Sequence, residues 1–554
     1  MPPRLRALAP ALAVIALVAC ARASTVAPTG ATSADITETD LRHRLFLIAD
    51  DSMLGRLTGS EGAHKTTEYI AAEFRRLGLE PAGENGTYFQ TMPAWRVGVD
   101  SQSRLEFDGD TLRVGRDFFP SWVTAPPRTL HAVSVILGGV VTDSTWISDA
   151  QARGKLVLID FPAGAGTVTF NPQRWPSAAA VGLVRYERIT SASMGRLRNA
   201  FVVNMMLDPA AVPVVQITRD AATRLLGGAP QSLRPGAVGR TTRGFIALAR
   251  SPVPFPARNV VAVLRGSDPA LRGQYVALTA HNDHVGFDNS PVDHDSLRAF
   301  NQVVRPMGAD SPVRSATAEE TARIRTILDS LRRVHRPRLD SIRNGADDDG
   351  SGTVSILEIA ERMALGGERP RRSILFVSHT GEEMGLLGSK WYTDHPTVPR
   401  DSIVAEIDQD MIGRGTVHDF PRGGTGAGSD TYLEVIGAKR LSRAFGEMME
   451  AANARQPIPF VFDYTYDSPG HPLQYYCRAD HYSYARYGIP SLALSRGEHL
   501  DYHQVTDEAQ YISYRDLARV SRMVHDGALA IANADARPAL DAPKPTDPNA
   551  PCRQ

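Results

Sequence analysis

The sequence predicts an α/β fold in which a mixed, largely parallel sheet is sandwiched by helices and a second, β-rich domain is inserted. Short apolar runs suited to buried strands recur after residue 257, namely NVVAVL, YVALTA, ILFVSH, IVAEID and SLALS. Helical patterns such as SGTVSILEIAERMA lie between them, and strands that alternate with helices favour a parallel sheet covered on both faces. With 554 residues, the chain is long enough for more than one domain.

The composition supports packed globular domains and gives no sign of a polyanionic partner. Hydrophobic residues make up 42% of the chain, and Lys plus Arg equals Asp plus Glu at 61 each. A formal charge of zero lacks the electrostatic footprint that nucleic-acid binding normally requires. We therefore expect no nucleic-acid partner, and the composition leaves the oligomeric state open.

Residues 1–20 have the pattern of an export signal. Arg4 and Arg6 precede an apolar run that is short for a membrane-spanning helix. The end of this run, Leu17-Val18-Ala19-Cys20, resembles a bacterial lipobox, in which the cysteine is lipidated; an ordinary cleaved signal is the alternative. We expect an exported protein, periplasmic or at the cell surface, anchored to the outer membrane by lipid on Cys20. Residues 21–40 are expected to form a flexible tether.

The other two cysteines are Cys477 and Cys552. They could pair in an oxidising compartment, but the sequence leaves this bridge open because Cys552 lies in the Pro-rich tail, residues 536–554. Two cysteines are too few for a cysteine-ligated structural zinc site. A metal site in this chain would therefore use His and carboxylate ligands.

Residues 96–250 are a separate β-rich block, with GKLVLIDF, AAAVGLVRYE and PVVQIT as its clearest strand patterns. The block lacks convergent His and acidic residues. It resembles the protease-associated domain that is commonly inserted into secreted peptidases. The alternative is an unrelated small β-rich insertion.

Possible metal ligands follow the predicted strands of the α/β region. Singly these signals are weak, because a DDD run is usually a turn and a lone His is usually structural. Their joint occurrence carries more weight, since ligands of open α/β sheets gather beyond the carboxyl ends of strands. In chain order the candidates are His281 with Asp283, the three aspartates of GADDDGSG, the pair Glu382 and Glu383, Asp410, and His503.

Six motifs together resemble the co-catalytic di-zinc exopeptidases of the aminopeptidase Y family, which includes bacterial leucyl aminopeptidases and glutamate carboxypeptidases. In order they are AHNDHVG, NGADDDGSG, SHTGEEMGLLGS, DQDMIGR, ADHYSYARYGIPSLAL and LDYHQVTD. The resemblance begins near GRLTGSEGAHK and continues almost to the tail. It implies a zinc peptidase domain formed by residues 41–95 and 251–535.

Carried over position by position, the resemblance implies two zinc ions held by five side chains. His281 and Asp410 would ligate one ion, and Glu383 and His503 the other. Asp348 would bridge them, as a carboxylate can when two ions lie about 3.5–4 Å apart. Imidazole and carboxylate are ordinary zinc ligands.

The resemblance also implies three catalytic roles. Glu382 would be the general base, taking a proton from a metal-bridging water and delivering it to the leaving amine. Asp283 would fix the ring of His281 from behind. Tyr502 would donate a hydrogen bond to the tetrahedral oxyanion.

Some neighbouring residues are expected to stay outside the ligand set. His284, His294 and His499 lie beside the motifs but out of register with them. Asp347 and Asp349 flank Asp348, and the choice among the three rests on register with the family motif.

Residues 287–344 separate the first two ligand motifs by more than a short loop. Within them, Thr317 and Glu320 match a capping box, and a helical stripe follows, made of Ile324, Ile327, Leu328, Leu331 and Val334. We predict a helical insertion that forms a lid over the active-site mouth. Plain core packing of the stripe is the alternative.

These observations predict a zinc-dependent exopeptidase that removes N-terminal residues from peptide substrates. A carboxypeptidase or dipeptidase could use the same scaffold, because pocket residues outside the metal set select the terminus. More remote alternatives are a glutaminyl cyclase with one zinc and a catalytically silent binding protein. Every expected ligand position is filled, which favours an enzyme.

Overall fold

The computed structural model describes residues 32–554 except 166–169, 199, 204–205, 416–418, 420–428 and 542. The predicted signal with Cys20 lies outside the described residues. The predicted tether ends earlier than expected, because helix α1 (Glu38–Ile48) begins within it and is capped by the Thr37 side chain, which accepts from the N–H of Asp40. Within the described residues, no helix is long and apolar enough to cross a bilayer.

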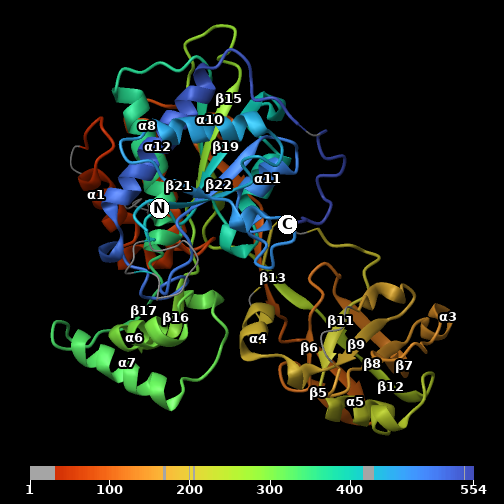
Figure 1. The fold of residues 1–554 in the computed structure, drawn as a ribbon. Helices are drawn as coiled ribbons and strands as arrows, with labels where there is room; N and C mark the ends of the chain where they lie inside the picture. Colours follow the sequence, from red (N-terminus) through yellow and green to blue (C-terminus); the bar gives the residue numbers. More distant parts are fainter. Residues whose placement is uncertain are drawn as a thin grey trace, which may run out of the picture. The chain divides into compact units, whose positions relative to one another are not determined.

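Among the described residues, a nine-stranded sheet forms the core of the α/β region (Figure 1). Its four central strands run parallel, in the order β18 (Ser373–His379), β15 (Tyr275–His281), β19 (Ile403–Gln409) and β22 (Ser491–Ser495). They are four of the predicted apolar runs, and all their residues except Ser495 are buried. Continuous burial is expected of strands covered on both faces.

The outer strands make the sheet mixed, as predicted. The segment NVVAVL lies in β14 (Ala257–Leu264), which runs antiparallel to β18. β1 (Glu80–Pro81) and β2 (Phe89–Met92) pair antiparallel with β14. At the other side, β20 (Tyr432–Ile436) is antiparallel to β22 and parallel to β21 (Val461–Asp463). The parallel arrangement is therefore concentrated in the four strands whose ends lead into the candidate ligands.

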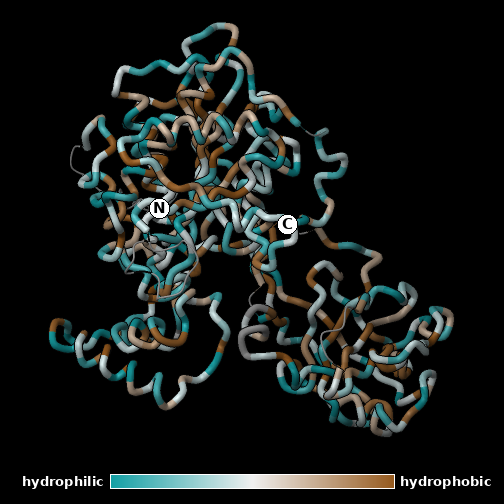
Figure 2. Tube along the Cα trace, in the orientation of Figure 1, coloured by the Kyte–Doolittle hydropathy of each residue, from teal (hydrophilic) through white to brown (hydrophobic). Residues whose placement is uncertain are grey.

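Helices cover both faces of this sheet. On one face Phe376 of β18 lies against Phe74 of α2. On the other face Val377 packs in a cluster with Tyr392 of α9 and Tyr484 of α11, because successive strand residues point to opposite sides. Apolar residues accordingly gather along the central strands (Figure 2). The helices are α2 (Glu61–Arg76), α8 (Gly352–Leu365), α9 (Leu387–Asp394), α10 (Arg443–Ala454), α11 (His481–Ala485) and α12 (Tyr514–Asn533).

The described residues of the β-rich block form an eight-stranded sheet of their own, with apolar clusters on both faces. Its three predicted strands are present as β8 (Leu156–Asp160), β9 (Ala180–Val184) and β11 (Val214–Ile217). Its likeness to a protease-associated domain stays a prediction.

The other strands of this sheet are β4 (Arg104–Phe107), β5 (Asp110–Arg113), β6 (Phe118–Pro120), β7 (Arg128–Val140) and β12 (Val238–Ile246), and its helices are α3 (Asp149–Ala152) and α5 (Arg219–Leu226). A three-stranded sheet consists of β3 (Ala94–Val99), β10 (Ala200–Val203) and β13 (Leu248–Pro252), with α4 (Ser191–Arg198) before β10.

The insertion at 287–344 is helical, as predicted. β16 (Phe287–Asp293) and β17 (Leu339–Ile342) pair antiparallel and carry α6 (His294–Val304) and α7 (Ala318–Leu331) between them. The predicted capping box of Thr317 and Glu320 is present. The apolar stripe is only half-buried, and Val334 at its end is 76% exposed. Full core packing of the stripe is therefore not what the structure shows.

Cys477 and Cys552 form a disulfide. The bond ties the C-terminal segment to the loop that precedes α11. The pairing that the sequence left open is thus present in the structure.

Candidate metal centre

The candidate ligands meet at one edge of the sheet. His281 is the last residue of β15, and Asp410 directly follows β19. β18 ends at His379 and leads into the short 3-10 turn Glu382–Met384. Since parallel strands end at the same edge, three separate segments deliver their side chains to one place.

Asp348 lies between two groups of side chains. Its Oδ1 lies 3.2 Å from Nε2 of His281, and its Oδ2 lies 2.9 Å from Nε2 of His503. Asp348 is almost fully buried. One carboxylate thus turns one oxygen toward each of two histidines that are far apart in sequence.

The first group consists of His281, Asp348 and Asp410. Nε2 of His281 lies 3.6 Å from Oδ1 of Asp410. The candidate donor atoms of the three residues all lie within 4.8 Å of one another. This set is compatible with one metal ion between an imidazole and two carboxylates.

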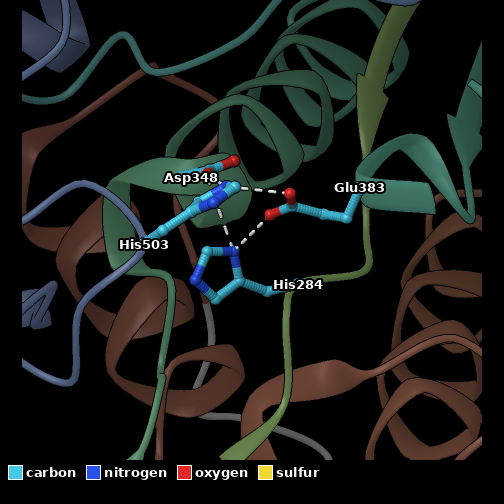
Figure 3. Close-up of side chains that lie close together, drawn as sticks. All are labelled: His284, Asp348, Glu383 and His503. Carbon is cyan, nitrogen blue, oxygen red and sulfur yellow. Dashed lines mark ion pairs between the residues drawn. The ribbon is translucent and has the colours of Figure 1, made fainter. Parts of the chain in front are cut away.

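The second group contains Glu383 and His503 together with Asp348. Nε2 of His503 lies 2.8 Å from Oε2 of Glu383. Figure 3 shows the Glu383 carboxylate and the His503 ring pointing toward one another, from the turn after β18 and the loop after β22. All five side chains that the sequence predicted as ligands are therefore brought together.

His284 also lies in the second group, contrary to the expectation that it stays outside. Its Nδ1 lies 2.7 Å from Oε1 of Glu383 and 3.6 Å from Oδ2 of Asp348 (Figure 3). The ring is fully buried. The physical reason is that the chain turns just after β15, so a residue three positions past His281 points back at the same site. The spacing His-x-x-His at a strand end was the signal that the prediction passed over.

The neighbours of Asp348 face away from this centre. Oδ1 of Asp347 accepts from the N–H of Gly413 at 2.6 Å, and its Oδ2 lies 3.2 Å from Nε2 of His499. Asp349 accepts from the N–H groups of His281 and Gly352. The selection of Asp348 as the shared residue therefore agrees with the geometry.

Buried polar atoms without hydrogen bonds test whether metal ions fit here. Despite the short N–O distances given above, Nε2 of His281, Oδ1 of Asp410, Oδ2 of Asp348 and Oε1 of Glu383 make no hydrogen bond of acceptable geometry within the described part of the chain. Leaving such atoms buried and unpaired destabilises a fold by about 1–3 kcal/mol each. Cations at the two groups would satisfy all four, so the residues present fit metal binding.

The electrostatics of the centre also favour bound positive charge. Burial raises the pKa of Glu382 well above the usual carboxyl value; His281 opposes this rise, and Asp410 and Glu383 reinforce it. For His503, burial lowers the pKa, but Glu383 and Asp348 outweigh it and raise the pKa to about 10. Four carboxylates crowd this centre, and bound cations would neutralise them.

Asp283 is held in place behind His281. Its Oδ2 accepts from the Thr58 hydroxyl at 2.9 Å, and its Oδ1 accepts from the N–H of Glu382 at 3.2 Å. Nδ1 of His281 lies 3.1 Å from the backbone oxygen of Asp283 and 3.6 Å from Oδ1. The ring is thus oriented by the backbone carbonyl as well as by the predicted carboxylate.

Tyr502 lies beside the second group. Its ring stacks on that of His503 with centroids 4.0 Å apart, and its hydroxyl lies 3.5 Å from Nη2 of Arg478. It lines the same cavity as Asp348 and Glu382. This position is compatible with contact to a substrate.

Two buried residues that the sequence did not single out hold the Asp348 loop. Asp507 accepts from the N–H groups of Asp347 and Asp348. Arg56 donates to the backbone oxygens of Asn344 and Gly345. Both lie within quoted motifs, LDYHQVTD and GRLTGSEGAHK, but nothing in those letters distinguishes a residue that supports a loop.

The two remaining histidines stay outside both groups, as expected. His499 contacts Asp347, as described above. His294 lies in the insertion, near Asp340 and Glu508. The guanidinium of Arg338 contacts both of these carboxylates, at 3.0 Å and 2.5 Å, so a cation is already present there.

Comparison with known proteins agrees with this geometry. Leucine aminopeptidase 1 of Paracoccidioides brasiliensis (strain Pb18) is 31% identical over 188 residues, covering 32% of this chain and 44% of that relative. Leucine aminopeptidase 1 of Coccidioides posadasii (strain C735) is 32% identical over 202 residues, covering 34% of this chain and 47% of that relative. This chain therefore spans less than half the length of these curated relatives.

Among solved structures, the aminopeptidase from Aneurinibacillus sp. strain AM-1 is similar, with 15% identity and a TM-score of 0.46, over 91% of this chain and 95% of that chain. Residues 259–528 match the family model described as peptidase family M28. This range includes all five predicted ligands, Glu382 and Tyr502. The chain therefore contains a domain of peptidase family M28.

Proposed function

We propose that this chain is a zinc-dependent aminopeptidase that removes single residues from the N-terminus of peptides. The observation that carries the proposal is the placement of Asp348, which turns one carboxylate oxygen toward His281 and the other toward His503. Aminopeptidases are among the enzymes that use two metal ions about 3.5–4 Å apart. The leucine aminopeptidases among the relatives support the choice of reaction.

In this proposal His281 and Asp410 hold one zinc ion, Glu383 and His503 hold the other, and Asp348 is shared. When bound, the ions would acidify a water molecule and polarise the carbonyl group of the scissile peptide bond. His284 contacts Glu383 and would restrain its carboxylate. Asp507 would keep Asp348 in place through the backbone of its loop.

Glu382 is the proposed general base. Its carboxylate lies 3.9 Å from Nε2 of His281 but belongs to neither candidate metal group. It lines the cavity next to Asp348 and Asp410, where it could take a proton from the attacking water and return it to the leaving amine. Asp283 accepts from the N–H of Glu382 and so fixes the backbone of this residue.

The proposal is tested with one peptide in two blocked forms. Zinc-loaded protein should release the N-terminal residue of the peptide whose carboxyl group is amidated, and leave the peptide whose amine is acetylated intact. Metal analysis of the same sample should give two zinc ions per chain. Cleavage of the acetylated peptide alone would identify a carboxypeptidase, and one tightly bound zinc without cleavage of either peptide would favour the cyclase alternative.

We further propose that the protein is exported and anchored through lipid on Cys20. The Cys477–Cys552 disulfide supports export, because disulfides persist in oxidising compartments. Labelling cells with a fatty acid that carries a clickable group tests the anchor. The wild-type protein should be labelled and the Cys20→Ser variant should not; equal labelling of both would overturn the proposed attachment site.

A further inference from the structure

A cavity opens beside the metal centre. Asp348, Glu382 and Asp410 line one part of it. Strands β20 and β22 contribute the part farther along the sheet, through residues such as Glu434 and Leu494. A substrate whose scissile bond lies at the metal centre would therefore place a neighbouring side chain against β20 and β22.

Two carboxylates belong to that distant part. Glu434 of β20 lies opposite Ser495 of β22 in the antiparallel register, and Glu498 follows three residues later. Both side chains are buried, with exposures of 2% for Glu434 and 8% for the Glu498 side chain. Burying a carboxylate is unfavourable unless a cation or hydrogen-bond donors compensate it. Two buried carboxylates in a substrate cavity therefore need an explanation.

The protein compensates this pair only in part. Glu434 accepts from the Tyr432 hydroxyl at 2.9 Å. The same hydroxyl lies 3.0 Å from Oδ2 of Asp463, so two carboxylates share its single proton. The Tyr475 side chain hydrogen-bonds Glu498. Arg478 is 3.4 Å from Oε1 of Glu498, but it also contacts Asp310 of the insertion at 2.8 Å. One guanidinium thus faces two carboxylates.

Oε2 of Glu498 has no hydrogen-bond partner in the described part of the chain. In their ionised forms, Glu434, Glu498 and Asp310 carry three negative charges against the single positive charge of Arg478. Burial raises the pKa of Glu434 to about 8 and that of Glu498 to about 7, which is the expected response of carboxyls that lack a full set of cations.

Apolar residues line the same cavity as the carboxylates and the metal centre. They include Met411, Ile436, Ala493 and Leu494. Such a lining suits an aliphatic chain, and a lysine or arginine side chain has an aliphatic stem that ends in a cation. A leucine side chain would occupy the apolar part and leave both carboxylates unpaired.

We propose that this cavity binds the side chain of a basic N-terminal residue, with Glu434 and Glu498 as the carboxylates that pair with its cation. This inference rests on the proposed aminopeptidase function and names its substrate class. The stem of the substrate residue contacts Ile436 and Leu494, and its ammonium or guanidinium group lies between the two carboxylates. Arg478 stays paired with Asp310. The lining of the cavity therefore contains one positive charge beside the two carboxylates.

The test compares substrates that differ in charge but not in shape. The kcat/KM of lysyl and arginyl 4-nitroanilides is measured beside that of the norleucyl and citrullyl compounds, with the leucyl compound as a reference. Wild-type protein should prefer each cationic residue over its neutral partner by about tenfold or more, since a hydrogen bond to a charged group contributes about 1.5–3 kcal/mol. The ratio within a pair cancels effects common to all substrates.

Two variants test whether the carboxylates cause the preference for basic residues. Glu434→Gln and Glu498→Gln should each lower the lysyl-to-norleucyl ratio by about tenfold. Glu447→Gln, an exposed position on α10, removes the same charge outside the cavity and should leave the ratio unchanged.

Several results would overturn the inference. A wild-type preference for norleucyl over lysyl compounds would exclude it without any variant, even if a variant fails to fold. Equal losses on lysyl, norleucyl and leucyl compounds would show that the carboxylates bind the α-amine that all substrates share. If none of the substrates is cleaved, the proposed aminopeptidase function fails instead, so the two failures are distinguishable.

Discussion

Glu382 and Glu383 are adjacent in sequence, yet their carboxylates face different histidines. Oε2 of Glu382 lies 3.9 Å from Nε2 of His281, whereas Oε2 of Glu383 lies 2.8 Å from Nε2 of His503. Gly381 before the pair and Gly385 after it both have positive φ, which allows the tight turn that separates the two side chains. The turn thus directs the two like charges to different parts of the metal centre, where bound cations would compensate them.

The two glutamates should therefore differ in their effects on zinc and on rate. Glu382→Gln is expected to retain two zinc ions and to lose about 10²–10⁴-fold in kcat, because an amide cannot transfer the proton. Glu383→Gln is expected to lose one of the two ions, because it removes a charged ligand. Metal content per chain and kcat on a leucyl substrate measure both effects. Equal zinc loss in the two variants would show that the roles are wrongly assigned.

His284 should matter to the second ion, although the sequence placed it outside the ligand set. Its Nδ1 lies 2.7 Å from Oε1 of Glu383, and removing a group that orients a ligand commonly weakens metal affinity by about 10–100-fold. His284→Gln is therefore expected to lower the affinity of one zinc ion by this amount in a competition titration with a chelator. His43→Gln, at an exposed position on α1, should leave both affinities unchanged. Unaltered zinc affinity in His284→Gln would show that the contact is incidental.

The preference for basic residues should depend on pH. Burial raises the pKa of Glu498 to about 7 and that of Glu434 to about 8, so both carboxyls gain charge as the pH rises through this range. The lysyl ammonium, with a usual pKa of about 10.4, stays positive throughout. The lysyl-to-norleucyl ratio of kcat/KM should thus increase by roughly tenfold between about pH 6 and pH 8.5.

A flat ratio over this interval would contradict the prediction. Measuring the ratio removes the titration of the metal centre and of the substrate α-amine, because both substrates share them. Glu498→Gln provides the control, since it lacks one of the two titrating carboxyls and should flatten the lower part of the rise.

Much of the fold and of the metal centre could be predicted from the sequence, for one physical reason. Buried parallel strands are continuous apolar runs, and the residues that follow them meet at one edge. This reasoning predicts that His281, the pair Glu382 and Glu383, and Asp410 lie at one edge of the sheet, whereas the choice of Glu383 and Asp348 as ligands rests on the family resemblance. The antiparallel direction of β14 could not be predicted in the same way, because a buried strand has the same apolar run in either direction.

The residues that support the metal centre were harder to predict from the sequence. Arg56 and Asp507 act through backbone groups of the Asp348 loop, and such contacts depend on how distant segments pack. Glu434 is a similar case, since a single acidic residue in the run YLEVI predicts an exposed strand position. Its burial becomes visible only when β20 is placed beside β22.

The insertion at 287–344 packs against the loop that carries Tyr502. The N–H of Ala309 donates to the backbone oxygen of Tyr502 at 3.0 Å. The side-chain amide of Asn301 donates to the backbone oxygen of Leu500 at 3.0 Å. Gly308 has a φ of +49° and lies so close that a Cβ there would clash with the backbone oxygen and nitrogen of Tyr502. We propose that the insertion fixes Tyr502 in addition to covering the active-site mouth.

Gly308→Ala should therefore impair catalysis through Tyr502. The added methyl group must push the insertion or the Tyr502 backbone away, and a misplacement of about 1 Å near the reacting groups can reduce the rate by about 10²-fold. Gly367→Ala is the matched control, because Gly367 also has a positive φ, +80°, but a Cβ added there would have no atom of the described residues within 4 Å. Both variants should lose about 1–2 kcal/mol of stability from the left-handed backbone, whereas only Gly308→Ala should lose kcat/KM on leucyl substrates. Equal activity of the two variants, at equal folded fractions measured by circular dichroism, would show that Tyr502 does not depend on the insertion.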